Sequence, residues 1–407
     1  MNLDPAQLPS QCDVLIVGAG PSGSAAAITL ARAGLDVVLV DQHTFPRDKI
    51  CGDGLIPDAH RALRKLGVLD EVMAQAQASG IIGCIGPRGG RMNVPGTLAV
   101  LPRKTLDLIL CRAATAAGAR MFAPLRFDST LDEGGVAVGA NLVHGDTTHT
   151  VRARWVVLAS GAVPQALMAA GMSERTTPSG VALRGYVKND AMVGRIDTLE
   201  FIWHRAIAPG YGWIFPCRDG VFNIGVGLAD SHNDARGGKL VKREVNLRHV
   251  MDEFTRVYAP ARELMQGGTL LGPMKGAPLR CSLEGARYTR PGLLVVGDAV
   301  GSTYSLSGEG IGKAMETGTL SAEAVLAGGT DAEVRTTYEA RLRALKPRFE
   351  MYRRANNLNT RPWLVDLLIW RANKTPRLMR RLSGVLDETS NPGNIVSLRG
   401  LRRLFVG

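Results

Sequence analysis

A glycine-rich turn near the start of the chain has the spacing of a phosphate-binding site. Positions 18–23 read GxGxxG, after the apolar run 13–17 and before the small-residue stretch 24–33. The first glycine permits a tight turn, the second lets backbone approach a pyrophosphate, and the third allows close helix packing. The helix start adds unpaired N–H groups and the positive end of its dipole. The predicted diphosphate contacts are Gly18, Gly20, Pro21, Ser22 and Gly23.

An acidic residue stands where a nucleotide ribose would need it. Asp41 follows the second apolar run, 37–40, and lies 23 residues beyond Gly18, with Gln42 next to it. A carboxylate at this strand end can accept hydrogen bonds from ribose hydroxyls. The order of strand, glycines, helix, strand and acid therefore predicts dinucleotide binding, with Asp41 and Gln42 as contacts. The pattern does not separate FAD from NAD, and glycine turns also serve merely to join strands to helices.

A second glycine-rich element lies almost 280 residues later. The apolar run 292–296 leads into Gly297-Asp298-Ala299-Val300-Gly301, and Gly308-Glu309-Gly310-Ile311-Gly312 opens a helical stretch that ends at Ala327. An aspartate at a strand end can bind a sugar alcohol, and the helix start can aim amide dipoles at another part of the same cofactor. An ordinary strand-to-helix connection is the alternative. The predicted contacts are Asp298, Gly308, Gly310 and Ile311.

Four segments carry a resemblance to a known family. Gly297-Asp298 resembles the second FAD motif of flavoproteins with the para-hydroxybenzoate hydroxylase fold. Residues 45–55, FPRDKICGDGL, resemble the flavin-side loop of the geranylgeranyl reductase family, and 211–216, YGWIFP, matches that family's YxWxFP motif. Residues 103–107, RKTLD, resemble the family's arginine element. The resemblance covers essentially the whole chain and implies FAD as cofactor, with contacts from Lys49, Cys51, Gly52, Arg103 and Gly161.

Two segments depart from the family pattern. Ser160-Gly161 stands where many relatives of the hydroxylase fold carry Asp-Gly, and residues 303–307, TYSLS, replace a proline-containing turn. We therefore expect different polar contacts at Ser160 and a different pocket shape near the flavin.

The positions of the motifs predict the architecture. The chain has 407 residues, with 45% hydrophobic and 21% charged, which suits two domains and an appendage. We expect an α/β fold with a Rossmann-like FAD-binding domain, interrupted by an antiparallel-sheet substrate domain and followed by a C-terminal helical segment. Strand-like runs at 181–187, 199–204 and 222–228 predict that sheet. The expected boundaries are 1–80, 103–165 and 285–330 for FAD binding, 81–102 and 166–284 for the substrate domain, and 331–407 for the basic helical region.

Three residues are candidates for contact with the substrate or the reacting centre. Tyr211, Trp213 and Phe215 alternate along an extended segment, so their rings share one face and can line a channel for an apolar ligand. Rings that only fill the core are the alternative. Cys51 is flanked by glycine and by Lys49, and a positive charge nearby would favour its thiolate. An inert buried thiol is the other interpretation. The candidate catalytic residues are Cys51, Tyr211 and Trp213.

Composition argues against several other classes. The six cysteines form no CxxC pair, and the seven histidines are scattered singles, so we expect neither disulfides nor a metal. Of the net charge of +12, residues 331–407 contribute +9, from 16 Lys and Arg against 7 Asp and Glu. No nucleic-acid motif accompanies this basic region, so we expect no nucleic-acid partner.

The basic region leaves two interpretations open. Apolar residues beside arginines, around Trp363 and Trp370, suit a helix lying on an anionic lipid surface. A helix that packs on the flavin domain and exposes its arginines is the rival. No run of 18 apolar residues and no leader is visible, so we expect a cytoplasmic protein with peripheral membrane contact as the open question.

The leading hypothesis is an FAD-dependent reductase that saturates carbon-carbon double bonds of an isoprenoid chain, such as a geranylgeranyl lipid or the side chain of a prenyl quinone. The alternative is a flavin monooxygenase that hydroxylates or epoxidises an apolar natural product, because one fold hosts both chemistries. Halogenation is a third option, and a non-catalytic FAD-binding protein a fourth. Only one dinucleotide fingerprint is visible, so NADPH or another carrier such as ferredoxin would deliver electrons transiently.

Overall fold

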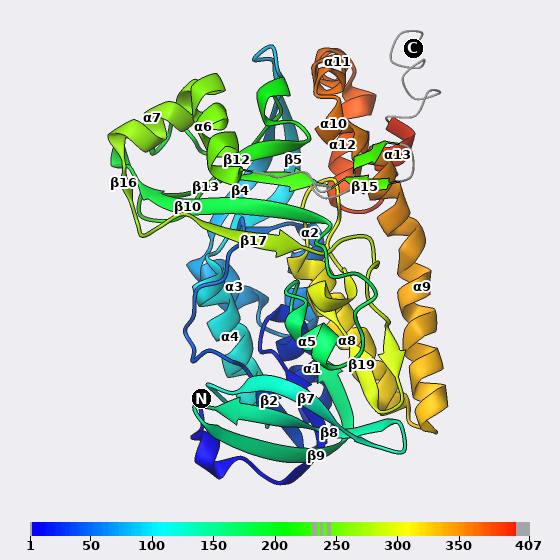
Figure 1. Cartoon of the computed structure of the whole chain (residues 1–407). Coiled ribbons are helices and arrows are strands. Elements are labelled where there is room, and N and C mark those ends of the chain that lie inside the picture. The colour runs from blue at the N-terminus through cyan, green and yellow to red at the C-terminus, as the bar shows by residue number, and fades with distance from the viewer. Residues whose placement is uncertain (1, 230–233, 237–238, 242–245, 396–407) are drawn as a thin grey trace.

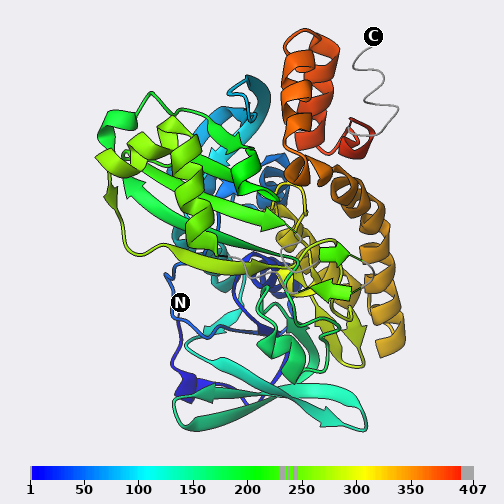
Figure 2. The same ribbon diagram turned by 45° about the horizontal axis from the view of Figure 1, so that its top comes forward.

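The computed structural model describes residues 2–229, 234–236, 239–241 and 246–395. Two bodies built on sheets lie one beyond the other, and the long helix α9 (Asp331–Ala355) runs along one side (Figure 1). The helices α6 (Leu247–Val257) and α7 (Ala259–Gly267) cover one face of the second sheet (Figure 2). This arrangement confirms the predicted α/β class, with a nucleotide-binding sheet interrupted by a mostly antiparallel one.

The first sheet has a parallel core from which the nucleotide turn starts. Its central strand β1 (Gln11–Val17) is buried from Val14 to Val17, as a strand with parallel neighbours on both sides requires. The order is β18-β19-β9-β1-β2-β6, with β7 and β8 attached to β9 as an antiparallel extension. The further strands are β2 (Val37–Val40), β6 (Arg120–Phe122), β7 (Arg126–Glu133), β8 (Val136–His144), β9 (Thr147–Leu158), β18 (Thr289–Arg290) and β19 (Leu293–Val295).

Close backbone contact holds the helices beneath this sheet. The helix α1 (Pro21–Arg32) begins three residues earlier than expected, because Pro21 has the fixed φ that suits a first helical position. It packs on α4 (Arg103–Ala116) and on α8 (Ile311–Ala327). A Cβ at Gly318 of α8 would lie 2.0 Å from the carbonyl oxygen of Ser22, so only glycine fits there.

The second sheet contains all three strands expected from the alternating runs. Its order is β16-β10-β13-β12-β11-β4-β5-β3, with β17 attached to β10. All of its pairs are antiparallel except that of β11 with β4. The strands are β3 (Gly54–Leu55), β4 (Gln77–Ile85), β5 (Arg91–Val100), β10 (Gly180–Lys188), β11 (Leu199–Ile202), β12 (Gly210–Pro216), β13 (Val221–Ala229), β16 (Thr269–Leu270) and β17 (Lys275–Leu279).

One expected strand is shorter than its sequence pattern. β11 ends at Ile202 rather than at His204, because the Nδ1 atom of His204 accepts a hydrogen bond from the N–H of Ala206 at 3.2 Å and starts a short 3-10 turn. The turn directs the chain back into β12.

The C-terminal helices pack on both bodies. α9 lies against α8, whereas α11 (Trp363–Ala372) packs its buried face on β4 and β5. The interpretation in which this helix packs on the flavin domain is wrong for α11, because Val365, Leu368 and Ile369 share an apolar cluster with residues of the second sheet.

The remaining elements complete the fold. They are α2 (Pro57–Lys65), α3 (Leu69–Gln75), α5 (Gln165–Ala169), α10 (Asn357–Thr360), α12 (Pro376–Leu386), α13 (Pro392–Ile395), β14 (Asp234–Arg236) and β15 (Lys239–Val241). The boundaries of the domains stay a prediction. β3 lies in the segment 1–80 that we assigned to FAD binding, but it pairs with β5 in the second sheet.

The contact between α1 and α8 generates a first prediction. In Gly318→Ala the added methyl must push the helices apart, and we expect the free energy of unfolding to fall by about 1–3 kcal/mol in urea titrations. Gly80→Ala is the control, because no atom lies within 4 Å of the added methyl there. Equal unfolding midpoints for the two variants would contradict the close packing.

Candidate active site

A cavity of about 1010 Å³ lies between the two sheets and gathers residues from distant parts of the chain. The nucleotide turn lines one end, the start of α8 lines the middle, and β11 and β12 supply the far wall. Gly23, the remaining predicted residue, lies under the turn, where a Cβ would meet the carbonyl oxygen of Gly18 at 1.8 Å. The predicted residues on the cavity are Gly18, Gly20, Pro21, Ser22, Asp41, Gln42, Lys49, Cys51, Gly52, Arg103, Gly161, Tyr211, Trp213, Asp298, Gly308, Gly310 and Ile311.

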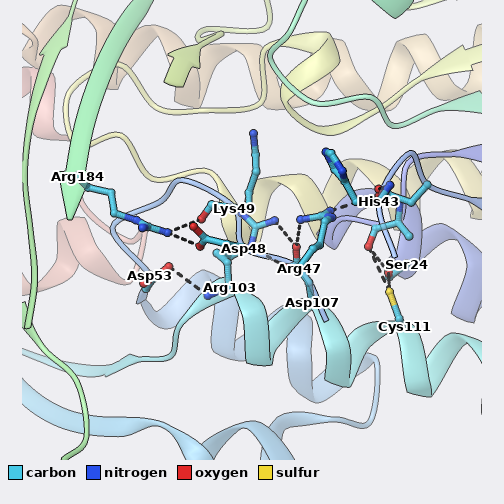
Figure 3. Close-up of polar contacts among 12 residues, drawn as sticks. Ser24, His43, Arg47, Asp48, Lys49, Asp53, Arg103, Asp107, Cys111 and Arg184 are labelled. Carbon is cyan, nitrogen blue, oxygen red and sulfur yellow. Dashed lines mark hydrogen bonds and ion pairs between the residues drawn. The ribbon is translucent and has the colours of Figure 1, made fainter. Parts of the chain in front are cut away.

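The nucleotide end of the cavity has the charge that a diphosphate needs. α1 starts after Gly20 without a side-chain cap, so its first N–H groups stay available to a ligand. A Cβ at Gly20 would lie 3.8 Å from the guanidinium groups of both Arg47 and Arg103. Buried Asp107 holds both arginines, Arg103 at 2.6 and 2.8 Å and Arg47 at 3.0 Å (Figure 3). Sequence reasoning missed Arg47 and Asp107, although the i, i+4 spacing of Arg103 and Asp107 was a signal.

Asp41 has partners in the glycine turn and in its own loop. Its carboxylate accepts hydrogen bonds from the N–H groups of Ala19 at 2.9 Å and of His43 at 3.0 Å, and lies 3.4 Å from Arg47. These bonds lock the glycine turn to the end of β2 while the carboxylate still borders the cavity. The ribose contact of Asp41 stays a prediction.

The second glycine element also presents polar groups to the cavity. Asp298 Oδ1 accepts from the Thr303 hydroxyl at 2.9 Å, and α8 begins after Gly310 without a side-chain cap. The hydroxyl of Ser160 is buried and has no hydrogen-bond partner among the described residues. Buried polar groups without a partner are costly, so a ligand with donors and acceptors suits this end of the cavity. These residues, together with the cationic turn, fit FAD.

A hydrogen-bonded clasp ties the flavin-side loop to the second sheet. Fully buried Asp53 accepts hydrogen bonds from the hydroxyl of Tyr186 and from the side-chain amide of Asn223, the latter at 2.8 Å. That amide also donates to the carbonyl of Cys51 at 2.8 Å, and its oxygen accepts from Trp213 Nε1 at 2.9 Å. Burial raises the pKa of Asp53 to about 6. One asparagine thus fixes both the loop and the indole ring; no motif pointed to it.

The same loop is held at its other end. Arg184 of β10 donates to Asp48 Oδ1 at 2.5 Å and to the carbonyl of Lys49 at 3.1 Å (Figure 3). The loop around Cys51 and Gly52 is therefore anchored from two strands, β10 and β13.

The thiol of Cys51 does not have the acidity expected from its charged neighbour. Burial raises its pKa, and the carboxylate of Asp53 raises it further, so the thiolate is disfavoured. The expected effect of Lys49 is outweighed, because the low dielectric around the loop penalises any charge. Burial also lowers the pKa of Lys49. Cys51 lies on the cavity as a neutral thiol.

The far wall of the cavity is aromatic, as the alternation in β12 predicted. The rings of Tyr211 and Trp213 lie 6.3 Å apart between centroids, and those of Trp213 and Phe215 lie 6.4 Å apart. Phe201 of β11, which sequence reasoning missed, lies 5.3 Å from Tyr211 and 5.1 Å from Phe215. The hydroxyl of Tyr211 donates to the carbonyl of Ser307. An apolar ligand in this part of the cavity would meet ring faces and edges.

The described ranges contain neither a metal-binding cluster nor a helix suited to cross a membrane. They hold no group of three or more His, Cys, Asp and Glu side chains placed to bind a metal ion. Within those ranges no helix has the length and hydrophobicity that a membrane crossing requires.

Comparison with known proteins agrees with this geometry. The family model described as an FAD binding domain matches residues 11–227. A menaquinone reductase of Mycolicibacterium smegmatis is 35% identical over 338 residues, 79% of this chain and 78% of that protein. A digeranylgeranylglycerophospholipid reductase of Methanosarcina mazei is 31% identical over 77% of this chain and 74% of that protein. The crystal structure of a geranylgeranyl bacteriochlorophyll reductase-like protein from Thermoplasma acidophilum superimposes with a TM-score of 0.72 at 21% identity, over 98% of this chain and 96% of that one.

The chain is an FAD-dependent oxidoreductase of the FAD-binding-domain class. Within that class it belongs to the geranylgeranyl reductase family of reductases.

The clasp generates a second prediction. Asn223→Ala removes one hydrogen bond from each of Asp53, the Cys51 carbonyl and the Trp213 indole, and we expect the free energy of unfolding to fall by about 1–3 kcal/mol. The loss should grow as the pH rises through about 6, because the amide favours the ionised form of Asp53 and its removal raises that pKa further in the folded state. Thermal unfolding at pH 5 and pH 8 measures both effects.

A matched variant controls for the loss of an asparagine. Asn93→Ala removes an exposed side chain whose oxygen accepts only from Arg91 among the described residues, so it should change stability by less than about 0.5 kcal/mol. A pH-independent loss in Asn223→Ala would contradict the clasp.

Proposed function

We propose that this reductase saturates carbon-carbon double bonds in an isoprenoid chain, such as that of a geranylgeranyl lipid or a prenyl quinone. One observation carries the proposal: the aromatic wall of β11 and β12 shares a single cavity with the FAD-type glycine turns. Such a wall suits a long apolar ligand, and the named relatives act on menaquinone and on digeranylgeranylglycerophospholipid.

The chain's own residues would bind FAD and the substrate, orient the two toward each other and exclude water from between them. The turn at 18–23, with Arg47 and Arg103, would hold the diphosphate of FAD, and Asp298 with the start of α8 would hold its flavin half. When bound and reduced, FAD supplies a hydride. An isolated alkene offers no carbonyl to polarise, so its placement matters most. Tyr211 and Trp213 would place the alkene, and their rotation is restricted by bonds to Ser307 and Asn223.

Electrons would come from NADPH or from another carrier that docks transiently. This part of the proposal rests on the single dinucleotide fingerprint of the sequence. To distinguish the candidate donors, each is mixed with the protein under anaerobic conditions. The donor that bleaches the flavin absorbance is the one that delivers electrons.

Product mass tests the reaction itself. Anaerobic protein reduced with dithionite should convert geranylgeranyl lipids or prenyl quinones into products heavier by two hydrogens for each bond. Unchanged lipids, together with oxygen-dependent addition of one oxygen atom to an aromatic or polyketide compound, would instead support a monooxygenase.

We also propose that α11 and the arginines near it rest on an anionic membrane surface. Trp363 and Trp370 lie two turns apart on the exposed side of α11, with 58% and 45% of their surfaces accessible. Arg361, Lys374 and Arg377 around them are exposed as well. Exposed indole rings beside cations suit the interface of an anionic bilayer, where an isoprenoid lipid would be collected.

Vesicle binding tests the membrane contact. The double variant Trp363→Ala with Trp370→Ala should bind phosphatidylglycerol vesicles about tenfold more weakly, as measured by co-sedimentation, because two interfacial anchors are lost. Met168→Ala with Val193→Ala is the control, since these exposed apolar residues lie elsewhere. Equal binding of wild type to phosphatidylcholine vesicles would contradict an electrostatic contact.

A further inference from the structure

A buried ionic cluster lies behind the middle of the cavity. At its centre is Lys313 of α8, whose side chain is 2% exposed. Its Nζ atom lies 2.6 Å from Glu316, 2.7 Å from Glu388 and 3.8 Å from Asp58. Three carboxyl groups thus surround one ammonium group inside the protein.

Asp58 of α2 lacks the partners that a buried carboxylate needs. Its side chain is 5% exposed, the nearest cation is Lys313 at 3.8 Å, and apart from the backbone N–H of Ala59 no residue that the structure describes donates a hydrogen bond to its oxygens. A Cβ at Gly312 would meet this carboxyl group at 2.3 to 2.5 Å, so Asp58 lies directly against the first turn of α8. Burial raises the pKa of Asp58 to about 6. A buried carboxyl group in this setting readily holds a proton.

Glu309 connects the cluster with the cavity. It lines the cavity between Gly308 and Gly310, beside Ser307 and Tyr211. The charges of Asp58, Glu388 and Lys313 shift the pKa of its carboxyl group, and the charges of Glu309, Glu388 and Asp58 raise the pKa of Tyr352 of α9. Burial, with a further contribution from Asp58, raises the pKa of Glu309 to about 8, so near neutral pH this side chain is an uncharged acid.

Glu388 connects the cluster with the surface. Its carboxylate accepts from the Tyr304 hydroxyl at 2.7 Å, from Arg61 at 2.8 Å and from Arg348 at 2.9 Å. The side chains of Arg61 and Arg348 are 47% and 36% exposed, so water reaches this end. Lys313 and these donors hold the pKa of Glu388 below its ordinary value, although burial alone would raise it.

Other acidic groups on the cavity are less suited to give up a proton. The Tyr211 hydroxyl donates its hydrogen to Ser307, and burial raises its pKa far above neutrality. The Cys51 thiol has a raised pKa as well. Asp53 is engaged by Tyr186, Asn223 and the N–H of Arg103.

We propose that Glu309 is the acid that protonates the second alkene carbon, and that Asp58, Lys313 and Glu388 return a proton to it from solvent. This inference rests on the proposed function. In the step, a hydride and its electron pair add to one alkene carbon, and the carboxylic O–H bond of Glu309 breaks as a C–H bond forms at the other. The hydride would come from reduced FAD, whose oxidation by two electrons would balance the reduction of the alkene, and Glu309 would be left as a carboxylate until water supplies a proton through Glu388.

Kinetics with two neutral substitutions test the assignment. Glu309→Gln replaces an uncharged acid by an uncharged amide, so FAD binding should persist. The rate of alkene reduction in a single turnover should fall on the order of 10²-fold. In the wild type the rate should fall as the pH rises through about 8, and this fall should be absent in Glu309→Gln. Asp58→Asn removes a nearby negative charge, which lowers the pKa of Glu309 and moves the fall to lower pH.

Glu323→Gln, in the helix α8 that follows Glu309, is the matched control. Glu323 pairs with Lys65 and Arg341, away from the cavity lining, and its substitution should leave the rate and the pH profile unchanged.

Infrared spectroscopy of the flavin-free protein gives a readout that does not need the reaction. The wild type and Glu323→Gln should show a protonated-carboxyl band at pH 7 that falls to half its intensity near pH 8, and Glu309→Gln should lack this component. Absence of that band from the wild type would overturn the proposal.

The kinetic outcomes separate the two levels of inference. Wild-type protein that reduces prenyl lipids while Glu309→Gln matches its rate and pH profile overturns the proton assignment alone. Wild-type protein that reduces no prenyl lipid overturns the proposed function, and the proton assignment falls with it.

Discussion

The site depends on the clasp between Asp53, Asn223 and the loop that carries Cys51. The two sheets come from interleaved chain segments, and a shared cavity forms only if the loop at 45–55 is held against the second sheet. Asn223 does this with three hydrogen bonds in a fully buried position, where an unmade bond would be costly. Asn223 also orients Trp213, so one residue positions both the loop at 45–55 and the aromatic wall of the cavity.

Charge is distributed unevenly along the cavity. At the nucleotide end Arg47 and Arg103 converge on the glycine turn, and Asp107 holds both in place from beneath. Near the start of α8 Glu309 borders the cavity, and burial raises its pKa to about 8, which favours the neutral acid. A diphosphate needs fixed positive charge, whereas an apolar alkene needs surroundings with little charge. One cavity thus offers both conditions in different parts.

Much of the site could be predicted because its motifs are local. The GxGxxG turn, the Gly-Asp element and the alternating rings of β12 each depend on short-range geometry, and of those predicted contacts only Gly23 lies beneath the cavity instead of on it. Arg47, Asn223, Phe201 and the cluster around Lys313 escaped prediction. Asn223 lies 170 residues from Asp53, and Glu388 lies 75 residues from Lys313, so no spacing rule relates them.

The sequence by itself determined the class of fold, the FAD-type turns and the aromatic row, because backbone conformation and side-chain alternation follow from neighbouring residues. Only the tertiary structure decided which groups are charged and which surface each helix covers. α11 packs on the second sheet, and Cys51 is a neutral thiol despite its lysine neighbour. The physical reason is that desolvation and packing depend on everything within a few ångströms of a group, and those neighbours come from all parts of the chain.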